Sequence, residues 1–198
     1  MRLQKTRQFI IEKLHHRFVD STYYHGVSHS LEVEEACIDI CKSELSISKN
    51  DAELLQIAAL SHDIGHSEKK CGHEQLGCNF ITKNLPVYGY SDKEIELIRR
   101  LILATKFPHE PKTKLEEIIC DADLSYIASG SYHDQADRLR KELTELFDHK
   151  FDSNIEWLKY QLDFLKNHKF FTEYAMNYFE PVKKTIISDI EEKLNSNS

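Results

Sequence analysis

One segment of the 198-residue chain constrains the fold more than any other, and it runs from Ser48 to His66. Ser48 offers a side-chain oxygen that can cap a helix, and residues 54–60 read Leu-Leu-Gln-Ile-Ala-Ala-Leu. A helix that is apolar on nearly every side must be covered by other elements. The segment therefore predicts a central helix, which ends in the polar sequence Ser-His-Asp-Ile-Gly-His.

The rest of the chain has helical periodicity, and no alternating run of β-branched residues is long enough for a sheet. Six glycines and four prolines are too few for the many tight turns of an all-β sandwich. We expect an all-α bundle of about eight or nine helices in one domain over residues 1–198, with a motif-bearing core at about 20–130 and additional C-terminal helices at about 131–195. Besides the central helix, the expected helices cover residues 2–19, 28–45, 73–84, 91–104, 114–128, 133–147, 153–167 and 171–194.

Charge and apolar content exclude several kinds of partner. The 26 Lys and Arg residues against 33 Asp and Glu residues give a net charge of -7, whereas binding to nucleic acid or an anionic membrane depends on cations that meet phosphates. No apolar run approaches the ~20 residues of a membrane helix, and the N-terminus does not resemble a secretory signal. We expect a soluble, cytoplasmic protein, and nothing in the sequence indicates its oligomeric state. Its five cysteines form no CxxC pair and are expected to be reduced: Cys37, Cys41, Cys71, Cys78 and Cys120.

Four residues from three predicted helices could hold a metal ion together. His62 and Asp63 are adjacent at the end of the central helix, where a carboxylate at the edge of a core is costly unless it is paired or metal-bound. His29 lies at the start of the second predicted helix, and Asp123 lies in a later one. Two imidazoles and two carboxylates suit a divalent ion with positions left open for water, namely Mn²⁺, Fe²⁺, Zn²⁺, Ni²⁺ or Mg²⁺.

These residues resemble the HD-domain superfamily of metal-dependent phosphohydrolases, whose pattern is H…HD…D on a helical bundle. The matching stretches are Tyr-His-Gly-Val-Ser-His at 24–29, Leu-Ser-His-Asp-Ile-Gly-His at 60–66 and Ile-Cys-Asp-Ala-Asp-Leu-Ser at 119–125. The resemblance implies an HD-type helical bundle with a divalent metal held by His29, His62, Asp63 and Asp123. Asp121 would then support the ligands without binding the metal itself, or it would be a helix-face carboxylate without a role. The C-terminal segment is similar to an uncharacterised bacterial branch of predicted HD phosphohydrolases, in the residues Trp157, Gln161, Phe164, Leu165, His168, Phe171 and Thr172.

The first motif also resembles cyclic-nucleotide phosphodiesterases, through Tyr-His-x-x-x-His-x-x-x-Val. In those enzymes the earlier histidine protonates the leaving oxygen, so the resemblance makes His25 a candidate general acid. Imidazole has a pKa that suits proton donation near neutral pH. The alternative interpretation of His25 is a residue that starts a helix beside Gly26, and His66 is the second candidate for the proton donor.

A second metal is a separate question. His73 begins a helix as His-Glu-x-x-Gly, which supplies a second-site ligand in two-metal HD proteins, and His66 or Glu74 could assist. The next predicted helix ends in Ala-Thr-Lys where such proteins usually have a histidine, and the next histidine is His109. We therefore expect one tight metal, with Asp63 able to bridge to a weaker, mostly water-coordinated Mg²⁺ or Mn²⁺.

Two further sets of residues have both a functional and a structural interpretation. Lys69, Lys70 and Lys106 flank the predicted site and could contact phosphate, or they could be solvated surface lysines. Gln161 and Phe164 share a helical face and could clamp a base, or they could serve only helix packing.

The leading hypothesis is hydrolysis of a small phosphorylated substrate, and the resemblance favours a nucleotide, cyclic or linear. The metal would lower the pKa of bound water, and the resulting hydroxide would attack phosphorus. Asp63 would orient that water or take its proton, while His25 or His66 would protonate the leaving oxygen. Two alternatives are a di-iron enzyme for oxidative cleavage and a non-catalytic sensor that binds a metal or a nucleotide.

Overall fold

The computed structural model describes residues 1–18, 23–66 and 72–196. These residues form ten α-helices and two 3₁₀ helices and contain no strand, which confirms the all-α prediction. In chain order the elements are α1 (Arg2–Arg17), α2 (Val27–Ser43), α3 (Lys49–Ser61), α4 (His73–Asn84), η1 (Leu85–Tyr88), α5 (Asp92–Ala104), α6 (Lys114–Asp123), η2 (Ser125–Ala128), α7 (Tyr132–Leu146), α8 (Asn154–Asn167), α9 (Glu173–Tyr178) and α10 (Glu180–Asn195).

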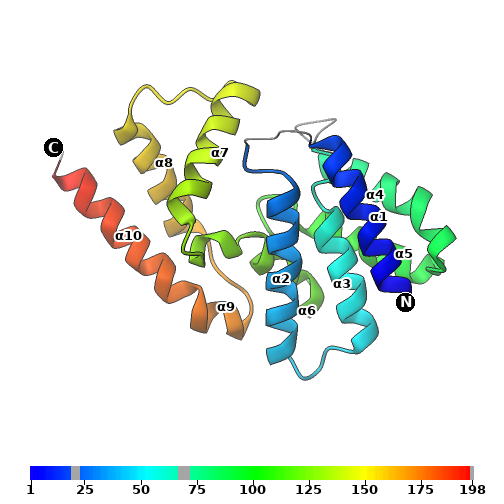
Figure 1. Ribbon diagram of the computed structural model, residues 1–198. Coiled ribbons are helices and arrows are strands. Elements are labelled where there is room, and N and C mark those ends of the chain that lie inside the picture. Colours follow the sequence, from blue (N-terminus) through cyan, green and yellow to red (C-terminus); the bar gives the residue numbers. More distant parts are fainter. Residues whose placement is uncertain (19–22, 67–71, 197–198) are drawn as a thin grey trace.

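Helices α1 to α6 form one group, called here the N-terminal group (Figure 1). Its centre is α3, which packs against α1, α2, α5 and α6 and buries every side chain from Leu54 to Ser61 except Gln56, as the apolar run predicts. The core around α3 is almost entirely aliphatic, with Leu54, Ile57 and Leu60 among its buried members. The N-terminus of α3 is fixed as expected, because the Ser48 hydroxyl accepts a hydrogen bond from the backbone N–H of Asp51 at 3.0 Å.

Element η2 and helices α7 to α10 form a second group, called here the C-terminal group, on the other side of α2 (Figure 1). Its core is rich in aromatic side chains, which include Tyr126, Tyr132, Trp157 and Phe170. Helix α10 packs against α8, α9 and η2 and so closes this group. The two groups meet where α2 contacts η2 and α9, so α2 lies between them.

Two predicted helices are interrupted in the structure, and each break has a local cause. The predicted helix 114–128 was wrong at its end, because Leu124 leaves the helical region with φ -100° and ψ 14° and the chain continues as η2. The predicted helix 171–194 is divided into α9 and α10. Thr172 caps α9 by accepting from the N–H of Ala175, and Pro181 lies in the first turn of α10, where its missing N–H is harmless.

The remaining boundaries differ by one or two residues, and α1 ends at Arg17 while residue 19 lies outside the described residues. The expected capping box of α5 is confirmed, since Ser91 and Glu94 each accept a hydrogen bond from the backbone of the other. Among the residues that the structure describes, no helix combines the length and the apolar character that crossing a bilayer requires.

Candidate metal centre

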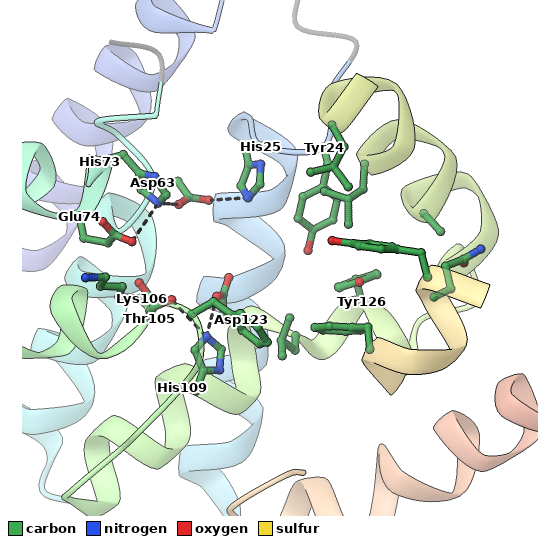
Figure 2. Close-up of a pocket in the computed structure, with 18 of the residues that line it drawn as sticks. Tyr24, His25, Asp63, His73, Glu74, Thr105, Lys106, His109, Asp123 and Tyr126 are labelled. Carbon is green, nitrogen blue, oxygen red and sulfur yellow. Dashed lines mark hydrogen bonds and ion pairs between the residues drawn. The ribbon is translucent and has the colours of Figure 1, made fainter. Parts of the chain in front are cut away.

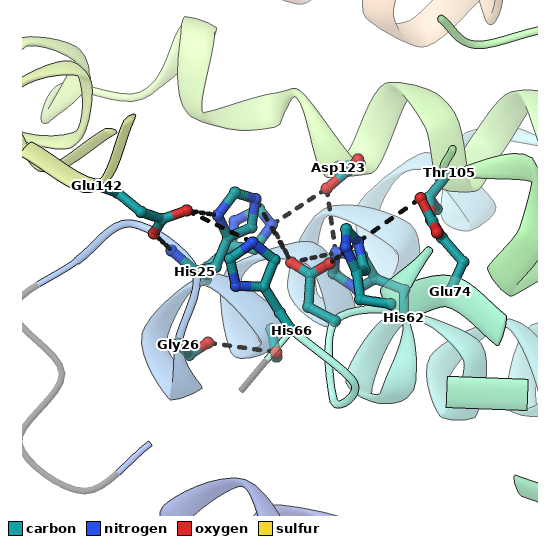
Figure 3. Close-up of polar contacts among 12 residues, drawn as sticks. His25, Gly26, His62, His66, Glu74, Thr105, Asp123 and Glu142 are labelled. Carbon is teal, nitrogen blue, oxygen red and sulfur yellow. Dashed lines mark hydrogen bonds and ion pairs between the residues drawn. The ribbon is translucent and has the colours of Figure 1, made fainter. Parts of the chain in front are cut away.

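The ends of three helices place four polar side chains together. His29 lies in the first turn of α2, His62 and Asp63 follow the last residue of α3, and Asp123 is the last residue of α6. Because α2, α3 and α6 pack against one another, these ends converge (Figure 3). His29, His62 and Asp63 are all buried, and the side chain of Asp123 is only partly accessible.

The distances within this cluster are short. His62 Nε2 lies 3.0 Å from Asp63 Oδ2 and 3.2 Å from Asp123 Oδ1. His29 Nε2 lies 3.1 Å from Asp123 Oδ1 and 3.5 Å from Asp63 Oδ2. His29, His62 and Asp123 therefore each offer one ligand atom within 4.8 Å of the other two, and Asp63 joins them through Oδ2. The four residues that the sequence predicts as ligands are thus neighbours in space.

The hydrogen bonds of the cluster fit a metal ion. The Nδ1 of His62 pairs with the carbonyl oxygen of Ala59 at 2.7 Å, and because a carbonyl can only accept, Nδ1 carries the hydrogen. Its Nε2 therefore faces the two carboxylates, and in the neutral ring this nitrogen carries the lone pair that a metal-binding histidine offers. His62 Nε2 and Asp63 Oδ2 are also buried atoms that make no well-formed hydrogen bond to any described residue. Buried polar atoms rarely lack a partner, and a divalent ion among these oxygens and nitrogens would provide one.

The same crowding shifts the pKa values of the cluster in the absence of an ion. Burial opposes the charge of His62, but the Asp63 and Asp123 carboxylates outweigh it and raise the pKa of His62 well above its ordinary value. Burial likewise opposes the charges of Asp63 and Asp123, and neighbouring histidines hold both pKa values well below the ordinary range. An ion that binds here must displace protons from the histidines, so its affinity will rise with pH.

His73 comes from the start of α4 and reaches the other oxygen of Asp63. Its Nε2 lies 3.2 Å from Asp63 Oδ1 and 3.7 Å from Glu74 Oε1. This approach requires a glycine at position 65, because a Cβ atom there would lie 2.3 Å from the carbonyl oxygen of His73 and 2.6 Å from the Cβ of Leu76. Asp63 thus has one oxygen toward the cluster and the other toward His73, as a bridging carboxylate would.

His25 and His66 lie beside the cluster and share a partner, Glu142 of α7, that the sequence analysis missed. Glu142 Oε2 accepts from the backbone N–H of His25 at 2.9 Å, and Oε1 contacts the ring at Nδ1. The His25 ring stacks on His66 at 4.2 Å, and its Nε2 lies 3.9 Å from Asp63 Oδ2. His66 Nε2 lies 3.6 Å from Glu142 Oε1. The only sequence signal for Glu142 is its spacing of three residues from Leu139, which puts a carboxylate on the apolar face of a helix.

A second missed residue is His109, in the loop between α5 and α6. Its Nε2 lies 3.1 Å from the carbonyl oxygen of Thr105 and 3.5 Å from Asp123 Oδ2, and its side chain is buried. The Thr105 carbonyl can only accept, so Nε2 carries a hydrogen, and the same N–H faces Asp123 Oδ2 and helps to lower the pKa of that carboxyl group. In the sequence this histidine follows the predicted helix 91–104. It reaches the cluster only because the loop between α5 and α6 folds back toward Asp123.

Two other predicted residues lie apart from the four-residue cluster. Asp121 is fully buried, and its carboxylate accepts hydrogen bonds from the N–H groups of Phe171 and Thr172, at 3.0 and 2.7 Å, and from the Thr172 hydroxyl at 2.8 Å. Burial, against these hydrogen bonds, raises the pKa of Asp121 to about 6. Asp121 therefore holds the segment before α9. Lys106 is exposed at the cavity, and Lys69, Lys70 and Cys71 lie outside the described residues.

A cavity of about 420 Å³ opens next to the cluster (Figure 2). Polar side chains line one end, among them Asp63, His73, Lys106 and Asp123. The other end lies in the C-terminal group and is mostly aromatic and aliphatic. Its lining residues are Tyr126, Tyr132, Ala136, Leu139, Leu143, Trp157, Tyr160, Gln161 and Phe164. The cavity thus spans the two groups of helices.

Comparison with known proteins agrees with this geometry, because the family model described as HD domain matches residues 26–125. The chain belongs to the HD domain family. A crystal structure of a predicted HD superfamily hydrolase from an uncultured Thermotogales bacterium has a similar fold, with a TM-score of 0.61 and 19% identity over 96% of this chain and 92% of that one. No curated protein matches the sequence. The HD segment contains all four predicted ligands, whereas Glu142 and the wall of the cavity formed by α7 and α8 lie beyond it.

Proposed function

We propose that this HD protein is a metal-dependent phosphohydrolase that cleaves a phosphate ester of a nucleotide. The observation that carries the proposal is the cluster of buried histidines and carboxylates, in which His62 Nε2 and Asp63 Oδ2 make no well-formed hydrogen bond. The adjoining cavity has a volume within the usual range for small-molecule sites. The HD family and the hydrolase named in the similar crystal structure agree with this class of reaction.

His29, His62, Asp63 and Asp123 would hold the ion, and the ion would supply Lewis acidity toward a phosphate oxygen and toward water. Asp63 lies against both histidine ligands, so it would orient the attacking water and accept its proton. Lys106, exposed at the same end of the cavity, would contact a phosphate oxygen. His73, which reaches the second oxygen of Asp63, would serve a weaker second ion.

His25 would donate the proton to the leaving oxygen. Glu142 fixes the His25 ring through Nδ1, so Nε2 is the nitrogen that faces the cluster. Burial and the neighbouring His25 lower the pKa of His66 to about 4, so His66 is neutral near pH 7 and is the weaker candidate. The geometry favours His25 over the interpretation of a residue that only starts α2.

We also propose that the protein acts in the cytoplasm. The four described cysteines are free, as a reducing cytoplasmic compartment requires, and three of them are buried. Because residues from both groups of helices line one cavity, we propose that the 198 residues act as one functional unit.

The test is hydrolysis of p-nitrophenyl phosphate and bis(p-nitrophenyl) phosphate by chelator-stripped protein to which Mn²⁺, Mg²⁺, Zn²⁺ or Ni²⁺ is restored. We expect metal-dependent turnover that Asp63→Ala abolishes while the circular dichroism spectrum stays helical. Preference for the diester would favour a cyclic nucleotide, which the position of His25 also supports, and preference for the monoester would favour a nucleotidase. Turnover that is unchanged in Asp63→Ala would contradict the assignment, and nucleotide binding without turnover in any metal would favour the sensor.

A further inference from the structure

A buried hydroxyl group in the cavity lacks a partner. The side chain of Tyr24 is 7% exposed, and its hydroxyl oxygen is buried without a hydrogen bond to any described residue. The ring is fixed by its neighbours, since its centroid lies 4.5 Å from that of His29 and 5.1 Å from that of Tyr126. Figure 2 shows the Tyr24 hydroxyl directed into the cavity, between Tyr126 and the polar end with Asp63. A buried hydroxyl without a partner is unfavourable, so a ligand that supplies an acceptor here is favoured.

The wall beyond Tyr24 is built from flat side chains in fixed positions. Tyr126 and Tyr132 are nearly parallel, with ring centroids 6.0 Å apart and an angle of 7° between the planes. The Tyr132 hydroxyl donates to Gln161 Oε1 at 2.9 Å, which holds the ring in place. Trp157 is parallel to Tyr160 within 17°. Aromatic surfaces of this kind bind flat rings by offset stacking or edge contacts as well as by apolar burial.

Small aliphatic side chains complete the same end of the cavity. Ala136, Leu139 and Leu143 of α7 lie along it, and Ala136 is buried although its side chain is a single methyl group. A bulky residue at position 136 would take up space in the cavity without touching the metal cluster. The small side chain of Ala136 therefore leaves space at the apolar end of the cavity.

We propose that Tyr24, Tyr126, Tyr132 and Trp157, with Ala136 beside them, form a site for an aromatic ring in the alcohol part of the ester. In this arrangement the Tyr24 hydroxyl donates a hydrogen bond to an oxygen of the phosphoryl group, because it lies between the ring site and the metal cluster. The inference rests on the proposed function for the position of the phosphoryl group. It assigns substrate selection to η2, α7 and α8, which lie almost entirely beyond the matched HD segment.

The test measures binding without turnover, with phenylphosphonate and methylphosphonate as probes that contain no cleavable ester bond. Trp157 is the single tryptophan of the chain and lines the ring site, so its fluorescence reports on occupancy directly. We expect phenylphosphonate to change the Trp157 emission in a saturable way and to bind metal-loaded protein about tenfold or more tightly than methylphosphonate.

Three variants separate the parts of the site. Tyr24→Phe should weaken both probes by about threefold to tenfold, because both carry the phosphoryl oxygens. Ala136→Leu should remove the preference for the phenyl probe and leave methylphosphonate binding unchanged, with thermal unfolding as the check on folding. Tyr178→Phe, at an exposed tyrosine, is the matched control and should change neither affinity.

Equal affinities for the two probes in the parent protein would overturn the ring site, even if the protein hydrolyses p-nitrophenyl phosphate. A saturable emission change that Ala136→Leu leaves intact would overturn it as well. A clear preference for the phenyl probe in a protein that hydrolyses no ester with any metal would instead contradict the proposed function and leave the ring site standing.

Discussion

The two groups of helices have cores of different chemistry. The core of the N-terminal group consists mainly of leucine, isoleucine, valine and alanine, and Tyr90 is the one fully buried aromatic residue among those described. The core of the C-terminal group has five aromatic residues among its buried members, namely Tyr24, Tyr126, Tyr132, Trp157 and Phe170. Aliphatic side chains pack without polar atoms, whereas tyrosine and tryptophan bring polar groups that need partners.

The two cores match two separate tasks of such a site. Ligands that must stay within a few tenths of an ångström of one another lie at helix ends whose other residues are locked in an aliphatic core. A wall that must accept part of a substrate is aromatic, because such side chains offer both apolar area and hydrogen bonds. We therefore expect substitutions in the N-terminal group to affect the reaction itself and those in the C-terminal group to affect selectivity and stability.

The strongest test of this division replaces two carboxylates, one in the metal cluster and one that holds the C-terminal group in place. Asp63→Ala should lower metal-dependent turnover by about 10³-fold or more, because it removes a proposed metal ligand that is also the group proposed to orient water. Asp121→Asn is the matched control, since it removes a buried carboxylate that serves the C-terminal group. Initial rates and urea unfolding of both variants should show lost turnover in the first and mainly lost stability in the second. An Asp121→Asn protein that is folded and as inactive as Asp63→Ala would refute the division.

A substitution at Gly65 would show how tightly the N-terminal group is packed beside the metal cluster. Gly65→Ala should lower the free energy of unfolding by about 3 kcal/mol, because the new methyl group meets the backbone of His73 and overpacking is costly. Gly130→Ala is the control, since an added Cβ there meets nothing within 4 Å, and it should be nearly neutral. Urea denaturation of the two variants gives the comparison. Equal stabilities would mean that α4 moves aside freely.

Within the C-terminal group, sensitivity to acid should arise from His168. Burial, Lys183 and His109 lower the pKa of His168 to about 3, and neither ring nitrogen has a hydrogen bond among the described residues. Below about pH 6.5 the unfolded chain binds a proton at this histidine that the folded chain does not, so stability falls as the pH falls. From pH 6.5 to pH 5 this loss amounts to about 2 kcal/mol.

Urea unfolding at pH 7 and at pH 5 measures that loss. His168→Phe should reduce the difference between the two pH values, whereas His133→Gln, at an exposed histidine, should keep it. The same pH dependence in the His168→Phe variant and in the parent would show that His168 is not responsible.

The smallest expected effect concerns Glu142, the one C-terminal residue assigned to the reaction. Glu142→Gln should lower kcat by about tenfold with little change in KM, because it loosens the orientation of His25. The loss should be larger for phenyl phosphate than for p-nitrophenyl phosphate, since a good leaving group needs no proton. Glu145→Gln on the same helix, whose carboxylate accepts from Tyr23 at an exposed position, is the control. Equal losses for both esters would assign Glu142 a merely structural role.

The sequence predicts most of what depends on local chemistry. The apolar run of α3 and the caps at Ser48 and Ser91 are short-range features, and the helices they predict are present. The four candidate ligands could be named because each one lies in a recognisable motif within the HD segment. These predictions need no knowledge of how distant segments meet.

Glu142, His109 and Tyr24 depend on long-range contacts and could not be predicted in the same way. Glu142 lies 117 residues from His25 in a helix with many charges, and its role depends on where α7 docks. His109 reaches Asp123 only through the course of a loop. Tyr24 belongs to a matched motif, but the lack of a partner for its hydroxyl becomes visible only when its surroundings are assembled.

Helix α6 carries two aspartates, two residues apart, that serve different groups of helices. Successive residues turn by about 100° around a helix, so Asp121 and Asp123 point to nearly opposite sides. Asp123 reaches the candidate ligands, and Asp121 holds the N–H groups of Phe171 and Thr172. A small shift of α6 on ion binding would therefore alter the exchange of these two amide hydrogens with deuterium. The exchange rates of the Phe171 and Thr172 amides would therefore report, without any substrate, whether an ion is bound in the N-terminal group.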